Sequence, residues 1–230
     1  QCRTRQRTAP TIRHWAIGPY GSDGIMDVQM TDLLRFDRNE MLARLNQLST
    51  HGRVAFAAAC ATRLGKAYEC WSARCGAGDP VAFDRLLCRL WGDVGGAALT
   101  HTECAGIESA ALELLLDDDA VGSDGATASD GAAALTYAMR CRRTGAAEEA
   151  LWTAQRAYDA VDHHVVHVGS VDLSTRGAEE RILRHPLIQQ ELARQHRDLD
   201  QLLRGRVSVD ELRRRATNEA TDFLPETDGR

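Results

Sequence analysis

The clearest hydrophobic pattern in the chain lies within residues 53–94, where it predicts a helical hairpin. An unbroken apolar run at 54–61 is followed by apolar residues at spacings of one, three or four positions: Leu64, Ala67, Tyr68, Trp71 and Cys75. At about 100° per residue, this spacing places them on one face of a helix. The Gly-Ala-Gly segment 76–78 ends that helix. Asp79 and Pro80 then supply an N-cap oxygen and the residue favoured at the first helical position.

The second arm of the hairpin repeats the pattern and predicts a helix up to about Val94. Its apolar face, which Trp91 flanks, consists of Phe83, Leu86, Leu87, Leu90 and Val94. Two helices joined by so short a turn pack antiparallel. We therefore predict that Trp71 and Trp91 lie in the core of the hairpin.

The helical period continues on both sides of the hairpin. N-cap and capping-box patterns mark several helix starts: Asp37 with Glu40, Thr100 with Glu103, and Ser208 with Glu211. Further helices are expected at about 37–50, 100–116, 129–143, 147–168, 178–184, 185–204 and from 208 onward. The helix after Gly145 has the most regular apolar seam, with spacings of four and three residues.

These patterns predict an all-α fold, a single-domain bundle of seven to eight helices built around the antiparallel hairpin at 53–94. We expect a disordered extension over residues 1–29, because they show no helical period. The all-α domain is expected over residues 30–220, and a frayed tail over residues 221–230.

Composition and charge exclude several classes of protein. The chain has 230 residues and a net charge of −5, so it lacks the basic surface expected of a nucleic-acid-binding protein. It has no apolar stretch near the roughly 18 residues that a membrane span needs. Seven cysteines without a C-x-x-C pair argue against a disulfide framework or a zinc site. We therefore expect a protein of the reducing cytoplasm.

Two segments invite a metal-binding interpretation. Residues 117–131 contain three consecutive aspartates, but they lack the ligand register of a calcium-binding loop, so a solvated loop is preferred. His163 and His167 are four residues apart, a spacing that can chelate a metal. With His164 they lie opposite the apolar seam of their helix, where a solvated face is the simpler interpretation. We expect no metal and no cofactor.

Three segments carry a resemblance to a known family. The hairpin supplies R-V-A-F-A-A-A-C-A-T-R at 53–63, Tyr68, G-D-P at 78–80 and R-L-L-C-R-L-W at 85–91. S-D-G-A-A-A-L at 129–135 and H-P-L-I-Q-Q-E-L-A-R-Q at 185–195 follow in the right order. Together they resemble the domain-of-unknown-function 416 family, the YjaG-like bacterial proteins. The resemblance implies a single all-α domain from the bacterial cytoplasm, and it implies no activity.

Polar residues interrupt two of the predicted apolar faces. In the helix expected at 185–204, Gln195 falls in the middle of the apolar face and Glu191 on its edge. Asp130 shares the side of its helix with Ala134, Tyr137 and Cys141. A carboxylate on an apolar face is costly unless it is paired and hydrogen-bonded. Cationic partners are therefore expected.

Arg63 is the first candidate partner, because it flanks the apolar face of the first hairpin arm. Arg85 is the second, and only the family resemblance favours it. We predict a buried or half-buried polar cluster of Arg63, Asp130, Glu191 and Gln195, with Arg85 as a further candidate. The alternative is that Asp130 only caps its helix and that Glu191 reaches water.

No known catalytic signature occurs in the sequence. The P-loop, G-x-G-x-x-G, G-x-S-x-G and H-E-x-x-H patterns are all absent. We therefore expect a non-catalytic protein-binding domain: an adaptor, a regulator or an immunity-type partner of a toxin. Its partner would be another protein or a second copy of the chain, with no role for nucleic acid or membrane. The alternatives are a small-ligand-binding helical protein and an enzyme with an unrecognised site.

Overall fold

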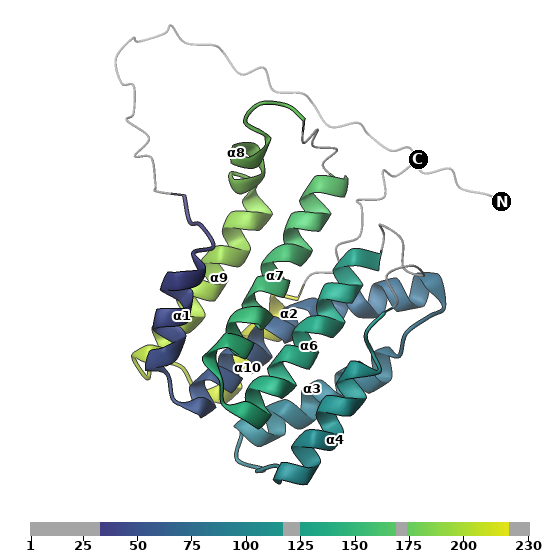
Figure 1. The fold of residues 1–230 in the computed structure, drawn as a ribbon, viewed down its shortest axis with the longest axis vertical. Helices are drawn as coiled ribbons and strands as arrows, with labels where there is room; N and C mark the ends of the chain where they lie inside the picture. The colour runs from purple at the N-terminus through teal and green to yellow at the C-terminus, as the bar shows by residue number, and fades with distance from the viewer. Residues whose placement is uncertain (1–32, 117–124, 169–173, 221–230) are drawn as a thin grey trace, which may run out of the picture. The chain divides into compact units, whose positions relative to one another are not determined.

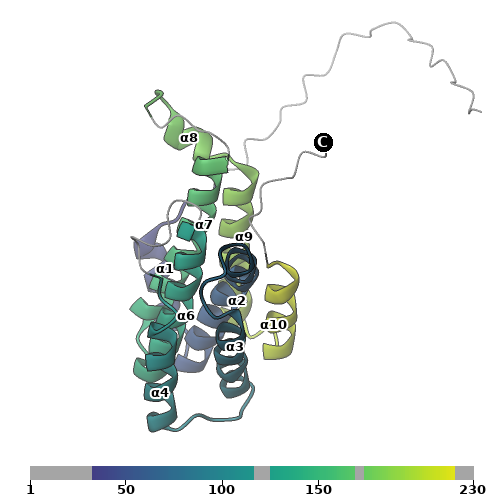
Figure 2. The same ribbon diagram turned by 90° about the vertical axis from the view of Figure 1, so that its right-hand side faces the viewer.

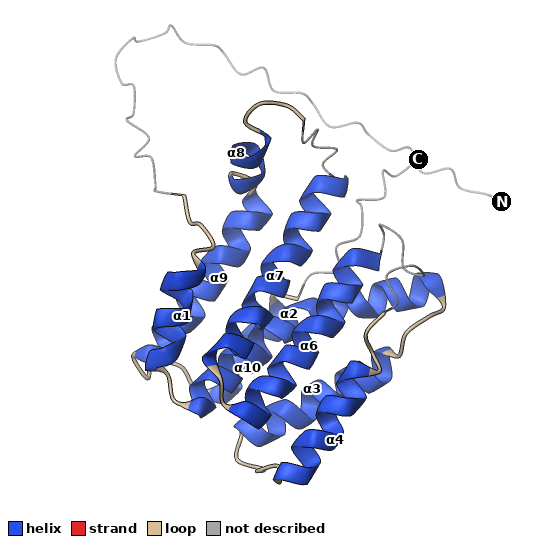
Figure 3. Ribbon diagram, in the orientation of Figure 1, coloured by secondary structure: helices blue, strands red, loops and turns tan. Residues whose placement is uncertain are grey.

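The computed structural model describes residues 33–116, 125–168 and 174–220, and these form helices joined by turns (Figures 1 and 3). The helices are α1 (Arg38–Gln47), α2 (Thr50–Cys75), α3 (Pro80–Val94), α4 (His101–Leu112), α6 (Ala126–Thr144), α7 (Ala147–Val168), α8 (Ala178–Leu183), α9 (Pro186–Leu203) and α10 (Val209–Asn218). No strand occurs in these described ranges, which confirms the predicted all-α class. The extension and tail predicted at 1–29 and 221–230 lie outside the described residues.

The described part of the chain contains nine helices, one for each segment delimited from the sequence, although the total was expected to be seven or eight. The short α8 is a helix of its own because Pro186 cannot continue a preceding helix. Helix α6 begins at Ala126, three residues before the predicted start at Ser129. Most of the aspartate-rich loop, residues 117–124, lies outside the described part. None of the described helices is long and apolar enough to cross a membrane.

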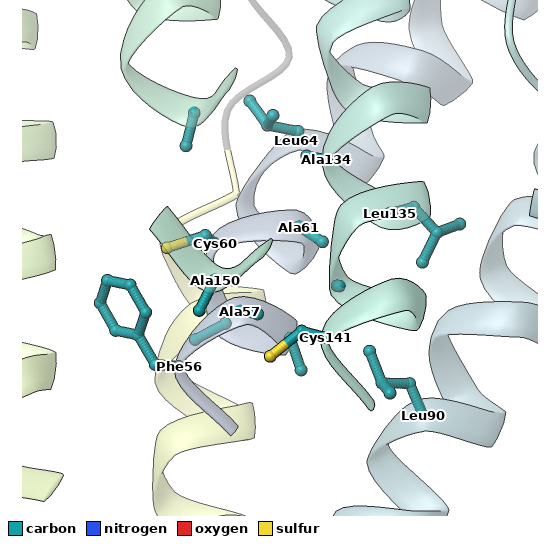
Figure 4. Packing of buried hydrophobic residues seen from close by; sticks show 14 of the residues in the cluster. Phe56, Ala57, Cys60, Ala61, Leu64, Leu90, Ala134, Leu135, Cys141 and Ala150 are labelled. Atoms are coloured by element: carbon teal, nitrogen blue, oxygen red, sulfur yellow. The ribbon is translucent and has the colours of Figure 1, made fainter. Parts of the chain in front are cut away.

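Helix α2 is the central element of the domain. Sixteen of its 26 residues are buried, and it contacts α3, α6, α7, α9 and α10. In the turned view, α2 lies between α6 and α7 on one side and α10 on the other (Figure 2). It can touch so many neighbours because six of its sixteen buried residues are alanines, whose small side chains let helices approach closely. Figure 4 shows small side chains on both sides of this contact, among them Ala57, Ala61, Ala134 and Ala150.

Four helix starts for which the sequence predicted a side-chain cap have one. Asp37, Asp79, Thr100 and Ser208 each accept a hydrogen bond from a backbone N–H in the first turn of the following helix. At Thr100 the capping box is complete, because the Glu103 side chain also accepts from the Thr100 N–H. Each cap satisfies backbone donors that have no partner within the helix.

The hairpin between α2 and α3 is closed by contacts around its turn. The Tyr68 ring stacks on Phe83, with 4.9 Å between ring centroids, and its hydroxyl oxygen accepts from the Asp79 N–H at 3.2 Å. Both tryptophans of the hairpin are buried, as predicted. The Trp91 indole N–H donates to the Thr62 hydroxyl across the hairpin at 2.9 Å, so a polar bond also joins the two arms.

Gly78 in this turn provides a test of the close packing. Its φ is +76°, and a Cβ at this position would lie 2.8 Å from the Tyr68 hydroxyl. Gly76 has a similar φ of +65°, but a Cβ there would meet nothing within 4 Å. We expect Gly76→Ala to lower the free energy of unfolding by about 1–2 kcal/mol, the cost of a left-handed alanine. Gly78→Ala should lower it further, because the buried Tyr68 ring must also move.

Urea unfolding of the two variants side by side measures this difference. Equal losses of stability in the two variants would show that Tyr68 does not pack against Gly78.

Candidate functional site

The first polar cluster is centred on Arg63, a buried charged residue of α2. The Arg63 guanidinium forms a two-pronged ion pair with Glu191 of α9, with Nε–Oε2 and Nη2–Oε1 distances of 3.1 Å. Its Nη1 donates to Asp198 Oδ2 at 2.9 Å. The three side chains are only 1–3% exposed. Such planar, paired bonds hold α2 and α9 in one relative position.

Gln195 connects this cluster to a third helix. Its amide nitrogen donates to Glu191 Oε1 at 2.9 Å and to the backbone carbonyl of Ala154, in α7, at 3.1 Å. The prediction that Arg63, Glu191 and Gln195 lie together therefore agrees with the geometry. Any functional role for them stays a prediction.

Asp198 extends the cluster to α10, and the sequence analysis missed it. Its Oδ1 accepts from Arg215 Nη2 at 2.9 Å and from Arg197 Nη2 at 3.0 Å, and Arg197 also pairs with Glu219 at 2.7 Å. A signal was present in the sequence. Asp198 lies seven residues after Glu191, which places both carboxylates on the same face of α9.

The electrostatics of the cluster favour a structural role over a reactive one. Burial disfavours the charged form of Arg63, but the Glu191 carboxylate, with smaller contributions from its other neighbours, raises the pKa of the guanidinium overall. Cys60 Sγ lies 3.3 Å from Arg63 Nη2, yet burial raises the pKa of this thiol to about 12. Because the thiolate is the nucleophilic form, Cys60 stays unreactive near neutral pH.

The structure separates Asp130 and Arg85 from this cluster, contrary to the prediction. Asp130 is buried and pairs with two residues of α7, with 3.1 Å from Arg156 Nη1 to Oδ1 and 2.9 Å from His163 Nδ1 to Oδ2. The side of α6 that carries Asp130 faces α7, whereas Arg63 faces α9. Asp130 does not cap its helix either, because α6 begins at Ala126. Arg85 is exposed on α3.

His163 differs from the solvated histidine that the sequence indicated, because it reaches Asp130 on the neighbouring helix. Its side chain is 43% exposed, and the hydrogen bond with Asp130 raises the pKa of the imidazole. In the described part of the chain, no three His, Cys, Asp or Glu side chains are arranged to hold a metal ion.

A groove lies on the other side of α2, between α3 and α10, with a volume of about 690 Å³. We call it the α2–α3–α10 groove. It is lined from α2 by Thr62, Gly65, Lys66 and Glu69, from α3 by Pro80, Val81, Phe83, Asp84, Leu87, Cys88 and Trp91, and from the C-terminal end by Arg213, Thr217 and Ala220. Most of this lining is apolar, so the groove is suited to binding apolar groups.

No sequence pattern indicated this groove, because it forms between segments about 150 residues apart. Helix α10 forms one wall, and the ion pairs of Asp198 with Arg215 and of Arg197 with Glu219 anchor α10 to α9. Gly65 contributes to the floor, where an added Cβ would lie 3.3 Å from the Phe83 ring. The ion pairs of the buried cluster therefore also hold α10, one wall of the groove, in place.

The buried ion pair of Arg63 can be tested by removing one partner. Glu191→Ala leaves the buried guanidinium with Asp198 as its only carboxylate partner, and we expect a loss of about 3 kcal/mol or more in the free energy of unfolding. Glu180→Ala is the matched control, because Glu180 pairs with Arg35 and Arg184 in an exposed position. It should cost under about 1 kcal/mol. Chemical denaturation measures both values, and a Glu191→Ala protein as stable as the control contradicts this account.

The pair of His163 and Asp130 predicts a pH dependence of stability. A histidine whose pKa is higher in the folded protein binds its proton more tightly when folded. The pair therefore stabilises the fold below the unfolded histidine pKa of about 6.5. This contribution is lost as the pH rises through the raised pKa of the folded state. The neighbouring acids Asp159 and Asp162 act in the same direction.

The test compares His163→Gln with His167→Gln, whose histidine is exposed, by urea unfolding between about pH 5.5 and pH 8.5. The loss of stability in His163→Gln should be larger at the acidic end and shrink toward the basic end. A loss that does not change with pH would contradict the assigned pairing.

Comparison with known proteins agrees with the resemblance noted in the sequence. A crystal structure of a DUF416 family protein from Shewanella baltica matches with a TM-score of 0.70 and 17% sequence identity, over 80% of this chain and 96% of that chain. This likeness shows a shared fold. No curated protein matches the chain. The family model described as "Protein of unknown function (DUF416)" matches residues 40–221, and the chain therefore belongs to the DUF416 family.

Proposed function

We propose that this protein is a non-catalytic binding protein that holds an apolar segment of another protein in the α2–α3–α10 groove. The observation that carries this proposal is the groove itself, in which the highly exposed Val81 lies beside the largely buried side chains of Phe83, Leu87 and Trp91. Val81 is 76% exposed, so an apolar side chain faces water at the rim. Covering such a surface with an apolar partner releases favourable free energy.

The dimensions of the groove favour an extended partner over a compact metabolite. Its lining follows α3 from Pro80 to Trp91, a rise of roughly 17 Å at 1.5 Å per residue. Asp84 and Cys88 on this wall are exposed, so the groove is open to solvent along α3. Sites for small molecules generally enclose most of the ligand surface. A peptide strand or a short amphipathic helix fits this open shape better.

The charges around the groove favour a nearly neutral partner. Two basic residues, Lys66 and Arg213, and two acidic residues, Glu69 and Asp84, line it. Opposite charges in equal number give no net attraction for a polyanion such as nucleic acid. Specificity would therefore come from apolar contacts in the groove.

A reducing compartment such as the cytoplasm fits this proposal. The six cysteines within the described ranges all have free thiols, and Cys75 and Cys88 are exposed. Exposed thiols persist in the cytoplasm, where disulfides are rare.

Photo-crosslinking in living cells tests the proposal. Val81 is replaced by p-benzoylphenylalanine, and the control carries the same residue in place of Leu112, an exposed apolar residue of α4. We expect one discrete protein adduct from position 81 and none from position 112. The adduct should be lost when Cys88→Glu, an exposed substitution, places a charge in the groove.

Mass spectrometry of the adduct then tests the chemistry of the partner. The crosslinked peptide should come from an apolar or amphipathic segment. Either of two results contradicts the proposal: no adduct from position 81, or the same adduct from both positions.

A further inference from the structure

A second cavity, of about 800 Å³, lies between the segment before α1, helix α7 and helix α8. We call it the α1–α7–α8 cavity. We propose that it is a binding site for an organic amine, whose ammonium group pairs with Asp162 and whose apolar body packs on Phe36 and Tyr158. The cavity shares no lining residue with the α2–α3–α10 groove, so this inference does not rest on the proposed function.

Helix α7 supplies one wall of the cavity. Gln155, Tyr158 and Asp162 follow one another at spacings of three and four residues, so they lie on one face of α7. The Phe36 ring packs on Tyr158, with 5.4 Å between the ring centroids. Helix α8 adds the buried side chains of Ala178, Ile182 and Leu183. The lining therefore combines an aromatic and aliphatic surface with one carboxylate from α7.

Asp162 carries a charge that the described part of the chain leaves without a cationic partner. Its side chain is half-buried, and no arginine or lysine within the described ranges forms an ion pair with it. Arg156 and His163 of the same helix pair with Asp130 instead. Burial raises the pKa of the Asp162 carboxyl, an effect that His163 opposes and Asp159 strengthens. An ammonium ion in the cavity would therefore meet a carboxylate that has lost part of its water without gaining a counter-charge.

The two arginines that line the cavity are held by other partners. Arg35 Nη2 pairs with Glu180 at 3.3 Å, and Arg38 Nη1 donates to Gln155 Oε1 at 3.1 Å. Gln155 precedes Asp162 by seven residues, which is about 10 Å along the helix axis. Arg38 is therefore held at the other end of the α7 wall, where salt screens its repulsion of a cation beside Asp162.

The chemistry of the lining favours an amine over other ligands. An anion would meet three carboxylates, from Asp162, Glu179 and Glu180, against two arginines. A metal ion would need several ligands, and within the described residues no three His, Cys, Asp or Glu side chains are arranged to hold one. An ammonium group needs one carboxylate, and aromatic rings attract cations as well as hydrocarbon. The volume lies in the range of sites that hold small molecules.

NMR titration of the ¹⁵N-labelled full chain tests the site. The probe is 2-phenylethylamine, and 2-phenylethanol and phenylacetate are the neutral and anionic controls with the same ring. We expect the amine to shift amide signals around the cavity, with a dissociation constant of about 1–10 mM, as befits nine non-hydrogen atoms. Both controls should bind at least about tenfold more weakly, because neither forms the charge-assisted bond to Asp162.

Two variants test the role of Asp162. Asp162→Asn keeps the shape of the side chain and removes its charge, so it should raise the dissociation constant of 2-phenylethylamine by at least about tenfold. Glu148→Gln is the matched control, because Glu148 is exposed on the same helix and lies outside the cavity lining. It makes the same change in net charge and should alter the dissociation constant by less than about twofold.

A further probe, Nα-acetyl-lysine methylamide, identifies the source of the ammonium group. Weaker binding than that of 2-phenylethylamine supports a free amine as the ligand, and tighter binding supports the same site with a lysine side chain of a protein as its occupant. Four results overturn the inference: no saturable binding of either amine, equal binding of phenylacetate, equal binding to the Asp162→Asn protein, or amide shifts at the α2–α3–α10 groove alone. A loss of stability in Asp162→Asn without any amine would also overturn it, because it would show that Asp162 already has a partner in the fold. None of these results bears on the capture of a partner from position 81.

Discussion

The burial of one arginine side chain determines how the C-terminal helices pack on α2. A guanidinium that is 2% exposed has lost its bonds to water, so carboxylates must replace them at fixed positions. Glu191 and Asp198 do so from α9, and Asp198 also pairs with Arg215 of α10. A single charge on α2 therefore constrains two helices that follow it by more than a hundred residues.

The groove depends on the same constraint. On α10, Arg215 points to the buried cluster, while Arg213 and Thr217, two residues before and after it, line the groove. Residues two positions apart lie about 200° apart around a helix, so they face opposite sides. On α2, two adjacent residues face these two sites: Thr62 lines the groove, and Arg63 enters the cluster. The same two helices thus carry one face that enters the buried cluster and another that lines the groove.

The elements that the sequence predicted are those governed by local rules. The hairpin, its caps and the buried tryptophans follow from periodicity and capping within a few residues. The contact of Arg63 with Glu191 followed from a weaker argument, that a carboxylate on an apolar face needs a cation. Asp130 was assigned the wrong partners because a helical projection shows which side of a helix is apolar, but not which neighbour covers that side. The groove depends entirely on such tertiary neighbours.

The shortness of α10 links binding to local folding. A helix of ten residues is marginal in isolation, so α10 persists through its ion pairs and its packing on α2. If α10 detached, one wall of the groove would be lost. A molecule in the groove that contacts α10 therefore binds the attached form more tightly and shifts the opening equilibrium of α10 by up to RT ln(1 + [L]/Kd). Slower amide hydrogen exchange in α10 would report occupancy of the groove without knowledge of the ligand.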